Sequence, residues 1–387
     1  MRLVVVGPYP TDPNRITTGV EAVIVYLLEG LREITELNVE VISCQKGMGR
    51  QETRLLEGLA VYYLPSPRRF GNLTLDIVEK ARVARKIEEL RPDIVHVHNH
   101  ANYPYLFAAP RHPTVTTVHG LVFREVSYDN ERLDVLRRPA RRFLERLVLR
   151  KAHDLIAVTR YVSEMVRPLT SARIHVVENP VSERYFDVAG SERERPDTLL
   201  FAGSIMERKN ILGLLRATCV LRDRIPSLQL RIAGGVAQLN YFHLLSAFVA
   251  ANELHKNVVF LGHLSETELL HEYSQSTLVV SCSREETSGM VVQQAMAAGK
   301  ASVVSRIGGF SCIVKDGETG FLVDPENIEG FAERIHLLLL DGELRRSVGE
   351  KARAEAFRRF TPAVIAKKTH DLYKRLVSEA PRFAEQR

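Results

Sequence analysis

The chain has 387 residues, of which 45% are hydrophobic and 26% charged, a composition typical of globular proteins and a length that favours two domains. The net charge of +6 is small for this size, so nucleic-acid binding does not follow from it. Cys44, Cys219, Cys282 and Cys312 are far apart and indicate neither a zinc site nor a disulfide framework. No apolar run approaches a membrane span, and MRLVVVGPYP is typical of a first strand rather than a signal peptide. We therefore expect a cytoplasmic two-domain protein.

In the first half, short apolar runs alternate with helical patterns, as expected for a parallel sheet covered by helices. We predict a strand at residues 3–6, a helix at 20–33, strands at 39–43 and 60–64 joined by a polar connection, a helix at 76–90, strands at 93–98 and 113–118, a helix at 137–152, and strands at 154–158 and 174–177. The first strand is followed by Gly7 but by no G-x-G-x-x-G, which argues against a nicotinamide or flavin site.

Histidines mark two of these strands. His96, His98 and His100 alternate, so an extended chain would direct all three to one face, a spacing that can chelate a metal. No acid or cysteine completes the set nearby, and we expect no metal. His119 follows the next strand, and the carboxyl ends of parallel strands are where ligands gather. His119 is therefore a candidate site residue, with a structural histidine as the alternative.

The predicted helix at residues 137–152 is basic and amphipathic, with Phe143, Leu144, Leu147 and Val148 on its apolar side. Such a helix can lie on the inner face of an anionic membrane, or it can pack its apolar side on the sheet and leave its arginines in water. We favour packing and leave peripheral membrane contact open. Residues 182–197 are charged and resemble a loop, so we place the domain boundary there.

The second half repeats the pattern. We predict strands at residues 198–202, 228–233, 258–261, 278–281, 301–305 and 316–323, and helices at 211–222, 290–298, 328–340, 343–357 and 362 to about 377. Arg208 and Lys209 precede the first of these helices, so two cations would lie beside its free backbone amides. Solvated surface cations are the alternative.

The stretch SREETSGMVVQQAMAAGK, residues 283–300, carries the strongest signal. Thr287 or Ser288 is the expected N-cap of an apolar, buried helix, and Gly299 is its expected left-handed C-terminal stop. The open amides of a helix start attract anions. Glu286 lies just before that start and Gln294 lies on the same face as Met290. One helix end thus offers donors for phosphate, a carboxylate and an amide.

This stretch resembles the signature of the family 4 glycosyltransferases, retaining enzymes of the GT-B fold, in which Glu is followed by seven residues and then Glu-Ala-Met-Ala-Ala-Gly. Here Glu286 is followed by seven residues, Gln294 and AMAAG, so an amide replaces the second acid. Ser204 stands where the family has arginine, Cys312 stands in the place of the acid of Gly-Gly-x-Pro-Glu, and Gly19 is the one glycine kept from Gly-Gly-x-Glu.

The resemblance implies two Rossmann-like domains facing across a cleft: residues 1–182 on the acceptor side, with the C-terminal helix 362–387 crossing back to them, and residues 197–361 binding the donor. It implies catalytic roles for Glu286 and His119. It implies that the donor is bound by Gly19, Arg208, Lys209, Gly234, Leu264, Ser288, Gly289, Met290, Val291 and Gln294.

The implied reaction moves a sugar from a nucleoside diphosphate sugar to an acceptor hydroxyl with retention, without metal or cofactor. Glu286 would orient the sugar rather than attack it. A sugar-nucleotide binding protein without turnover, a GT-B epimerase or phosphorylase, and a dinucleotide-dependent oxidoreductase remain as alternatives. The base, the sugar, the acceptor and the oligomeric state are left open.

Overall fold

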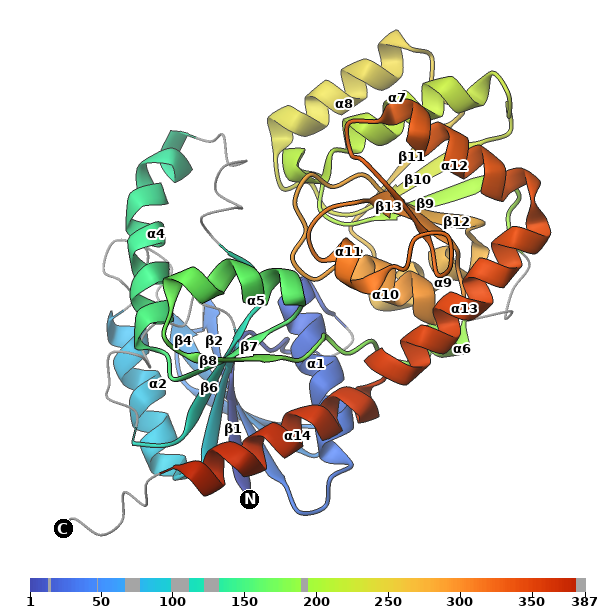
Figure 1. Cartoon of the computed structure of the whole chain (residues 1–387). Helices are drawn as coiled ribbons and strands as arrows, with labels where there is room; N and C mark the ends of the chain where they lie inside the picture. Colours follow the sequence, from blue (N-terminus) through green and yellow to red (C-terminus); the bar gives the residue numbers. More distant parts are fainter. Residues whose placement is uncertain are drawn as a thin grey trace, which may run out of the picture. The chain divides into compact units, whose positions relative to one another are not determined.

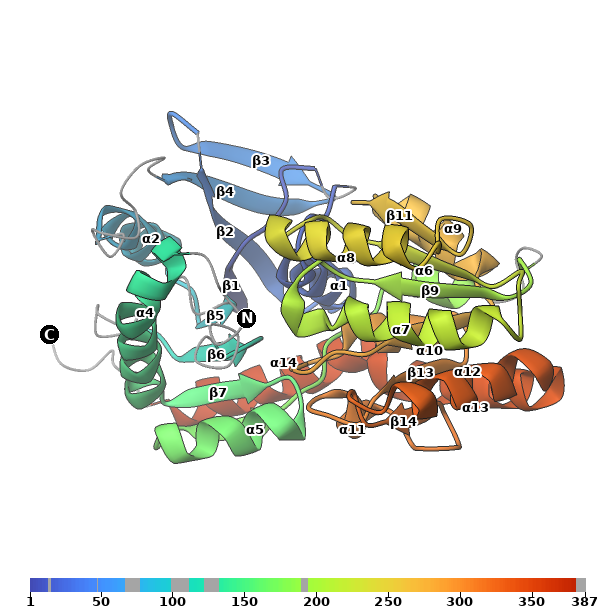
Figure 2. The same ribbon diagram turned by 90° about the horizontal axis from the view of Figure 1, so that it is seen from above.

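The computed structural model describes residues 1–12, 15–46, 48–66, 77–98, 111–121, 132–188 and 194–380 (Figures 1 and 2). The chain divides into two compact units, Met1–Pro180 with Pro362–Arg387, and Val181–Thr361. The second unit therefore begins before the charged segment in which we placed the boundary. Part of that segment, predicted as a loop, is the short helix α6 (Glu183–Asp187), whose Tyr185 and Phe186 are buried.

The first unit is built on an eight-stranded sheet in the order β3-β4-β2-β1-β5-β6-β7-β8. Its strands are β1 (Arg2–Val6), β2 (Asn38–Lys46), β3 (Glu52–Leu56), β4 (Leu59–Ser66), β5 (Ile94–His98), β6 (Thr114–Val118), β7 (Asp154–Ala157) and β8 (Arg173–Val176). Its helices are α1 (Gly19–Arg32), α2 (Ile77–Leu90), α4 (Arg132–Lys151), α5 (Arg160–Val166), the 3₁₀ helix η3 (Arg167–Leu169) and α14 (Pro362–Glu379). All neighbouring strands are parallel except β3, which is antiparallel to β4.

Strand β3 corrects the polar connection predicted between the second and third strands. It forms a hairpin with β4 around Glu57 and Gly58, which both have positive φ as tight hairpin turns require. The strand is an edge strand, and its Leu55 is 76% exposed. An edge strand of this kind lacks the apolar alternation from which a strand is predicted.

The apolar side of α4 also differs from the prediction. Val148 is buried as expected, but Phe143 is 66% exposed, and Leu149 and Ala152 at the end of the helix are buried instead. The side chain of Leu144 lies outside the described residues. The buried face is thus rotated relative to the one that we predicted.

The C-terminal helix α14 packs against α1 in the first unit (Figure 1). A glycine permits this contact, because a Cβ on Gly30 would lie 2.2 Å from the carbonyl oxygen of Pro362. Tyr373 of α14 is fully buried and its hydroxyl lies 2.5 Å from Nδ1 of His96 on β5. The tail is therefore part of the core of the first unit.

The second unit has a six-stranded, all-parallel sheet in the order β11-β10-β9-β12-β13-β14. Its strands are β9 (Thr198–Ala202), β10 (Gln229–Ala233), β11 (Val258–Gly262), β12 (Leu278–Ser281), β13 (Ser302–Ser305) and β14 (Phe321–Val323). Besides α6, its helices are η4 (Glu207–Lys209), α7 (Ile211–Arg222), α8 (Leu239–Ala251), α9 (Glu266–Gln275), α10 (Met290–Ala297), α11 (Phe310–Ile313), α12 (Ile328–Leu340) and α13 (Gly342–Phe360).

Both sheets start in the middle and grow outward in both directions, which is the doubly wound Rossmann-like arrangement. In the second unit the order corresponds to 3-2-1-4-5-6, and its direction reverses between β9 and β12. Ligands of such sheets bind beside the carboxyl ends of the strands at this reversal point. No helix in the described ranges is both long and apolar enough to cross a membrane.

Candidate active site

The loops that follow β9 and β12 meet at the reversal point of the second sheet, and they carry the charged residues singled out in the sequence. The β9 loop ends in η4, which contains Arg208 and Lys209, and the β12 loop contains Glu286. The two loops are held together by a hydrogen bond from the Arg284 amide to the Arg208 carbonyl, 2.9 Å long. The sheet topology thus brings together groups that are far apart in sequence.

Glu286 and Lys209 form a buried ion pair. The distance from Lys209 Nζ to Glu286 Oε2 is 2.6 Å, and the two side chains are only 13% and 11% exposed. Burial would raise the pKa of Glu286, but the positive charges of Lys209 and Arg208, with hydrogen bonds from Lys209 and the Gly289 amide, lower it to about 2. Glu286 is therefore a carboxylate at neutral pH, held beside a lysine.

Arg208 lies on the same loop, and not every nitrogen of its guanidinium has a hydrogen-bond partner among the described residues. Its Nη1 donates to the carbonyl oxygen of Glu285 over 2.7 Å. Its Nε is enclosed, yet has no hydrogen-bond partner among the described residues. Because that nitrogen is enclosed, Arg208 acts here through its positive charge, which helps to lower the pKa of Glu286 and would attract an anion.

The start of α10 corrects the predicted N-cap. Neither Thr287 nor Ser288 caps the helix; Gly289 occupies the cap position with a φ of 68° and provides no side chain. A Cβ there would lie 2.8 Å from the ring of Phe310, so glycine is required for both conformation and space. The predicted left-handed stop at Gly299 is confirmed by its φ of 67°.

Without a capping side chain, the first amides of α10 are open. The Val292 and Gln293 amides bond to the Gly289 carbonyl, whereas those of Met290 and Val291 have no partner among the described residues. Open amides at a helix start carry a partial positive charge. Together with the cations of the β9 loop, they form a concentration of donors suited to a phosphate group.

The glycine pair Gly308-Gly309 packs against the backbone of the loop that carries Glu286. The Gly309 amide donates to the Glu286 carbonyl over 2.8 Å, and a Cβ on Gly308 would lie 2.1 Å from that oxygen. Phe310 of α11 continues this contact onto Gly289. The sequence showed this glycine pair, but its role as a support for the loop was not predicted.

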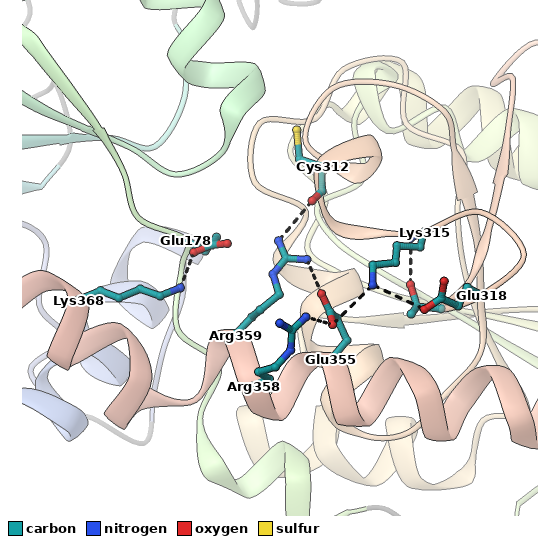
Figure 3. A network of polar contacts seen from close by, with 9 residues as sticks. Glu178, Cys312, Lys315, Glu318, Glu355, Arg358, Arg359 and Lys368 are labelled. Atoms are coloured by element: carbon teal, nitrogen blue, oxygen red, sulfur yellow. Dashed lines mark hydrogen bonds and ion pairs between the residues drawn. The ribbon is translucent and has the colours of Figure 1, made fainter.

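Cys312 on α11, which stands where the family has an acid, makes its contact through the backbone. Arg359 near the end of α13 donates to the Cys312 carbonyl over 3.3 Å, and Glu355 pairs with Arg359, Arg358 and Lys315 (Figure 3). This network joins α13 to α11. Arg359 of α13 thus contacts the backbone of α11 directly, without a carboxylate at position 312.

The remaining predicted donor-binding residues of the second unit are spread over the neighbouring loops. Gly234 follows β10 and packs so tightly that a Cβ on it would lie 1.9 Å from the Gly203 carbonyl oxygen. Leu264 lies half-buried in the loop between β11 and α9. Ser288 precedes Gly289 at the start of α10.

Gln294 is buried in the second turn of α10, and its amide contacts Tyr273 of α9. The Tyr273 hydroxyl lies 3.2 Å from Gln294 Oε1 and 3.0 Å from the Val291 carbonyl oxygen. The pattern of the chain does not single out Tyr273, because a tyrosine in an amphipathic helix is ordinarily a core residue. It is a neighbour of the candidate site that we did not predict.

His119 and Gly19 belong to the first unit. His119 Nε2 lies 3.0 Å from Nδ1 of His98. The ring centroid of His98 is 4.0 Å from that of His96. His100, the third histidine of the alternating set, lies outside the described residues. Gly19 is the first residue of α1, whose start is fixed by a capping box between Thr18 and Glu21. No group of three or more His, Cys, Asp or Glu placed to hold a metal occurs in the parts of the chain that the structure describes.

Comparisons with known proteins show the family and the fold. N-acetyl-alpha-D-glucosaminyl L-malate synthase of Bacillus anthracis is 26% identical over 315 residues, which cover 77% of this chain and 78% of the relative. The structure of sucrose-phosphate synthase from Thermosynechococcus elongatus aligns with a TM-score of 0.82 at 20% identity. The alignment covers 98% of this chain and 100% of that chain.

HepE of Anabaena, solved in complex with UDP-glucose, aligns with a TM-score of 0.74 at 17% identity over 97% of this chain and 100% of that chain. The family described as Glycosyltransferase Family 4 matches residues 17–184, and the family described as Glycosyl transferases group 1 matches residues 184–355. Two matches that together span both units leave one assignment: the chain is a glycosyltransferase and belongs to family 4, with the GT-B fold.

Proposed function

We propose that the protein transfers a sugar from a nucleoside diphosphate sugar to an acceptor hydroxyl with retention of configuration. The observation that carries the proposal is the group of donors at the reversal point of the second sheet: Arg208, Lys209 and the open amides of α10, beside the carboxylate of Glu286. A diphosphate is the ligand whose charge and oxygen atoms fit these donors. The UDP-glucose bound to HepE, a protein of the same fold, supports the choice of donor.

In the proposed reaction, the bond between the sugar C1 and the diphosphate oxygen breaks, and a bond from C1 to the acceptor oxygen forms on the same face. The proton of the acceptor passes to the departing phosphate. Arg208, Lys209 and the α10 amides stabilise the negative charge that develops on the leaving group, which is electrostatic catalysis and requires no metal. Glu286 accepts hydrogen bonds from the sugar hydroxyls, and His119 contacts the sugar or the acceptor.

The stereochemical outcome tests this proposal. The protein is incubated with α-linked nucleoside diphosphate sugars, with water as the acceptor, and the first product formed is followed by proton NMR. We expect the α-anomer before mutarotation. A β-anomer as first product would contradict retention. Binding without any product would indicate a binding protein without turnover, and a new sugar nucleotide or a sugar phosphate would indicate an epimerase or a phosphorylase.

We also propose that α4 contacts an anionic membrane surface. Arg142, Arg146 and Arg150 follow one another at intervals of four residues, are exposed, and have no ion-pair partner among the described residues. Like charges at this spacing destabilise a helix, and Phe143 beside them exposes 66% of its surface to water. A surface of anionic lipid would offset both costs, because it offers negative charge to the arginines and an apolar layer to the ring.

Vesicle sedimentation tests the membrane proposal. Vesicles rich in phosphatidylglycerol should sediment the protein and phosphatidylcholine vesicles should not, and reversing the charge of the three arginines to glutamate should abolish the difference. A control reverses two cations elsewhere, Arg346 and Lys351, which are exposed on α13. Equal sedimentation of both variants, or none with the anionic vesicles, would contradict a membrane role for α4.

A further inference from the structure

Helix α8 of the second unit is apolar on both its inner and its outer side (Figures 1 and 2). The inner side packs on the core: Leu245 and Val249 are buried, and the Tyr241 hydroxyl accepts a hydrogen bond from the Leu212 amide of α7 over 3.0 Å. A helix on the surface of a domain ordinarily buries one apolar stripe in this way and turns charged residues to water.

The outer side of α8 departs from that rule. Leu239 is 58% exposed and Leu244 is 49% exposed, and Val236 in the preceding loop is 46% exposed. The other exposed positions of the helix are Asn240, His243, Ala247, Ala250 and Ala251. No Asp, Glu, Lys or Arg occurs in residues 232–252, although 26% of the chain is charged. An exposed apolar face of this kind marks a surface that binds another molecule.

The exposed side chains of α8 are ordered by size along the helix. The larger ones, Leu239, His243 and Leu244, lie in its first half, and Ala247, Ala250 and Ala251 lie in its second half. Two such helices that run antiparallel place the first half of each against the second half of the other. Leu239 of one copy then lies opposite Ala250 of the other, and His243 lies opposite Ala247. Large side chains thus meet small ones, as close packing requires.

The antiparallel arrangement is also the one that a second copy of the chain can supply. A twofold axis uses the same surface on both partners, so the surface must be complementary to itself. A parallel pair would set leucine beside leucine and leave the alanines apart, whereas the antiparallel pair fits and also opposes the two helix dipoles.

A lipid layer fits the face less well than a second helix does. Helices that lie in a membrane interface insert large apolar side chains and carry lysine or arginine on their polar face. Here alanines form much of the face and bury little area, and residues 232–252 offer no cation. Alanines instead allow a neighbouring helix to approach to an axial distance of about 8 Å.

The size of the face sets the strength of the pairing. A helix of 13 residues is about 20 Å long and about 10 Å wide, so α8 covers about 200 Å². Stable interfaces bury roughly 800 Å² on each partner, with an apolar centre and a polar rim. The face of α8 matches such a centre, and the exposed Glu253, His255 and Lys256 beyond its end match a rim. We expect a dimer that dissociates on dilution.

We propose that α8 is the centre of a reversible homodimer, in which it packs antiparallel on α8 of a second copy about a twofold axis between Leu244 and Ala247. The contact is made by the second unit alone, and it holds whichever reaction the protein performs.

Sedimentation velocity of the full chain at about 1 to 100 μM tests the pairing. The wild type should pass from one chain to two with a dissociation constant roughly in the micromolar range. In Ala247→Glu, which places a charge beside the axis in both copies, that constant should rise about a hundredfold or more. Ala354→Glu, the same change at an exposed alanine of α13, is the matched control and should dimerise like the wild type. A wild type that stays a single chain, or equal dimerisation of Ala247→Glu, would overturn the proposal.

An exchange of sizes tests the antiparallel fit, with circular dichroism to check that each variant is folded. Ala250→Leu adds apolar surface but sets a second leucine against Leu239, so the dissociation constant should rise roughly tenfold. Adding Leu239→Ala restores a large residue opposite a small one and should return the constant toward that of the wild type. Tighter pairing in Ala250→Leu, or no recovery in the double variant, would overturn the fit. A wild type that sediments as a single chain yet binds phosphatidylcholine vesicles would show that lipid covers α8 instead.

Discussion

At the scale of single residues, the site is organised by a carboxylate that is paired with one of its cations. Glu286 lies 2.6 Å from Lys209 and 3.4 Å from the Gly289 amide, so it already satisfies one of the donors that we assign to the phosphate. Its pKa of about 2 means that it stays ionised near neutral pH. We therefore infer that an incoming diphosphate must displace this carboxylate from Lys209.

The change Glu286→Gln tests this competition. Transfer should fall roughly a hundredfold or more, because a hydrogen-bond acceptor for the sugar and its charge are lost. Affinity for the free nucleoside diphosphate should rise about three- to tenfold, because Lys209 no longer has a competing anion. Glu326→Gln, which removes a carboxylate paired with Arg284 at 2.6 Å, is the control and should alter neither quantity much. Unchanged turnover in Glu286→Gln would remove Glu286 from the site.

The sequence could predict the residues whose role depends on local spacing, and it could not predict those whose role depends on a partner from another element. Arg208, Lys209 and Glu286 can be singled out from their spacing alone, and their loops meet because parallel strands end at one edge of the sheet. The contact of Tyr273 with Gln294 could not be predicted, because it joins α9 to α10. The N-cap was misassigned because the residue at the cap position must be glycine to make room for Phe310, and that contact is tertiary.

At the scale of elements, the docking of α14 on α1 depends on the absence of one side chain. The Cβ of an alanine at position 30 would lie 2.2 Å from the Pro362 carbonyl oxygen and 2.8 Å from the Cβ of Ala366. Backbone cannot yield as a flexible side chain does, so the helices would have to separate. The periodicity of the sequence alone predicts α14 as a helix. That α14 packs on the first unit followed only from the resemblance to the family.

We expect Gly30→Ala to lower the free energy of unfolding by about 1–3 kcal/mol, the usual cost of overpacking, although alanine favours a helix more than glycine does. Chemical denaturation monitored by circular dichroism measures it. Gly49→Ala, at a position where a Cβ would meet nothing within 4 Å, is the matched control and should be close to neutral. A stabilised Gly30→Ala variant would show that the contact is looser than described.

At the scale of the whole molecule, the two doubly wound sheets differ in what lies at their reversal points. The second has the cations Arg208 and Lys209 beside the open amides of α10, whereas the first has buried histidines. Burial, and then the charge of His119, lower the pKa of His96 to about 3, and burial, with the charges of both neighbours, lowers that of His98 well below its usual value. Both histidines are therefore neutral in the folded protein.

This neutrality predicts a loss of stability in mild acid. In the unfolded chain a histidine binds its proton below about pH 6.5, whereas in the folded protein His96 does not until about pH 3. The unfolded state thus binds more protons in this window. As the pH is lowered, the free energy of unfolding should decrease by up to about 1.4 kcal/mol per pH unit for each histidine. Urea titrations between pH 7.5 and 5.5 measure it. His255→Gln, at an exposed position, should leave the slope unchanged, and a flat profile would contradict the burial of the two histidines.

The central claim is that the second unit binds the diphosphate of a sugar nucleotide. The most direct test is the thermal stabilisation of the purified protein by nucleoside diphosphates, nucleotide sugars and nicotinamide dinucleotides, without added metal, for the wild type and Lys209→Ala. A ligand at a hundred times its dissociation constant should stabilise the wild type by about 2.7 kcal/mol, and one diphosphate with its sugars should do so much less in the variant. The account would be contradicted if none of these ligands stabilised the protein, or if a nicotinamide dinucleotide did so instead. It would also be contradicted if the wild type and Lys209→Ala were stabilised equally.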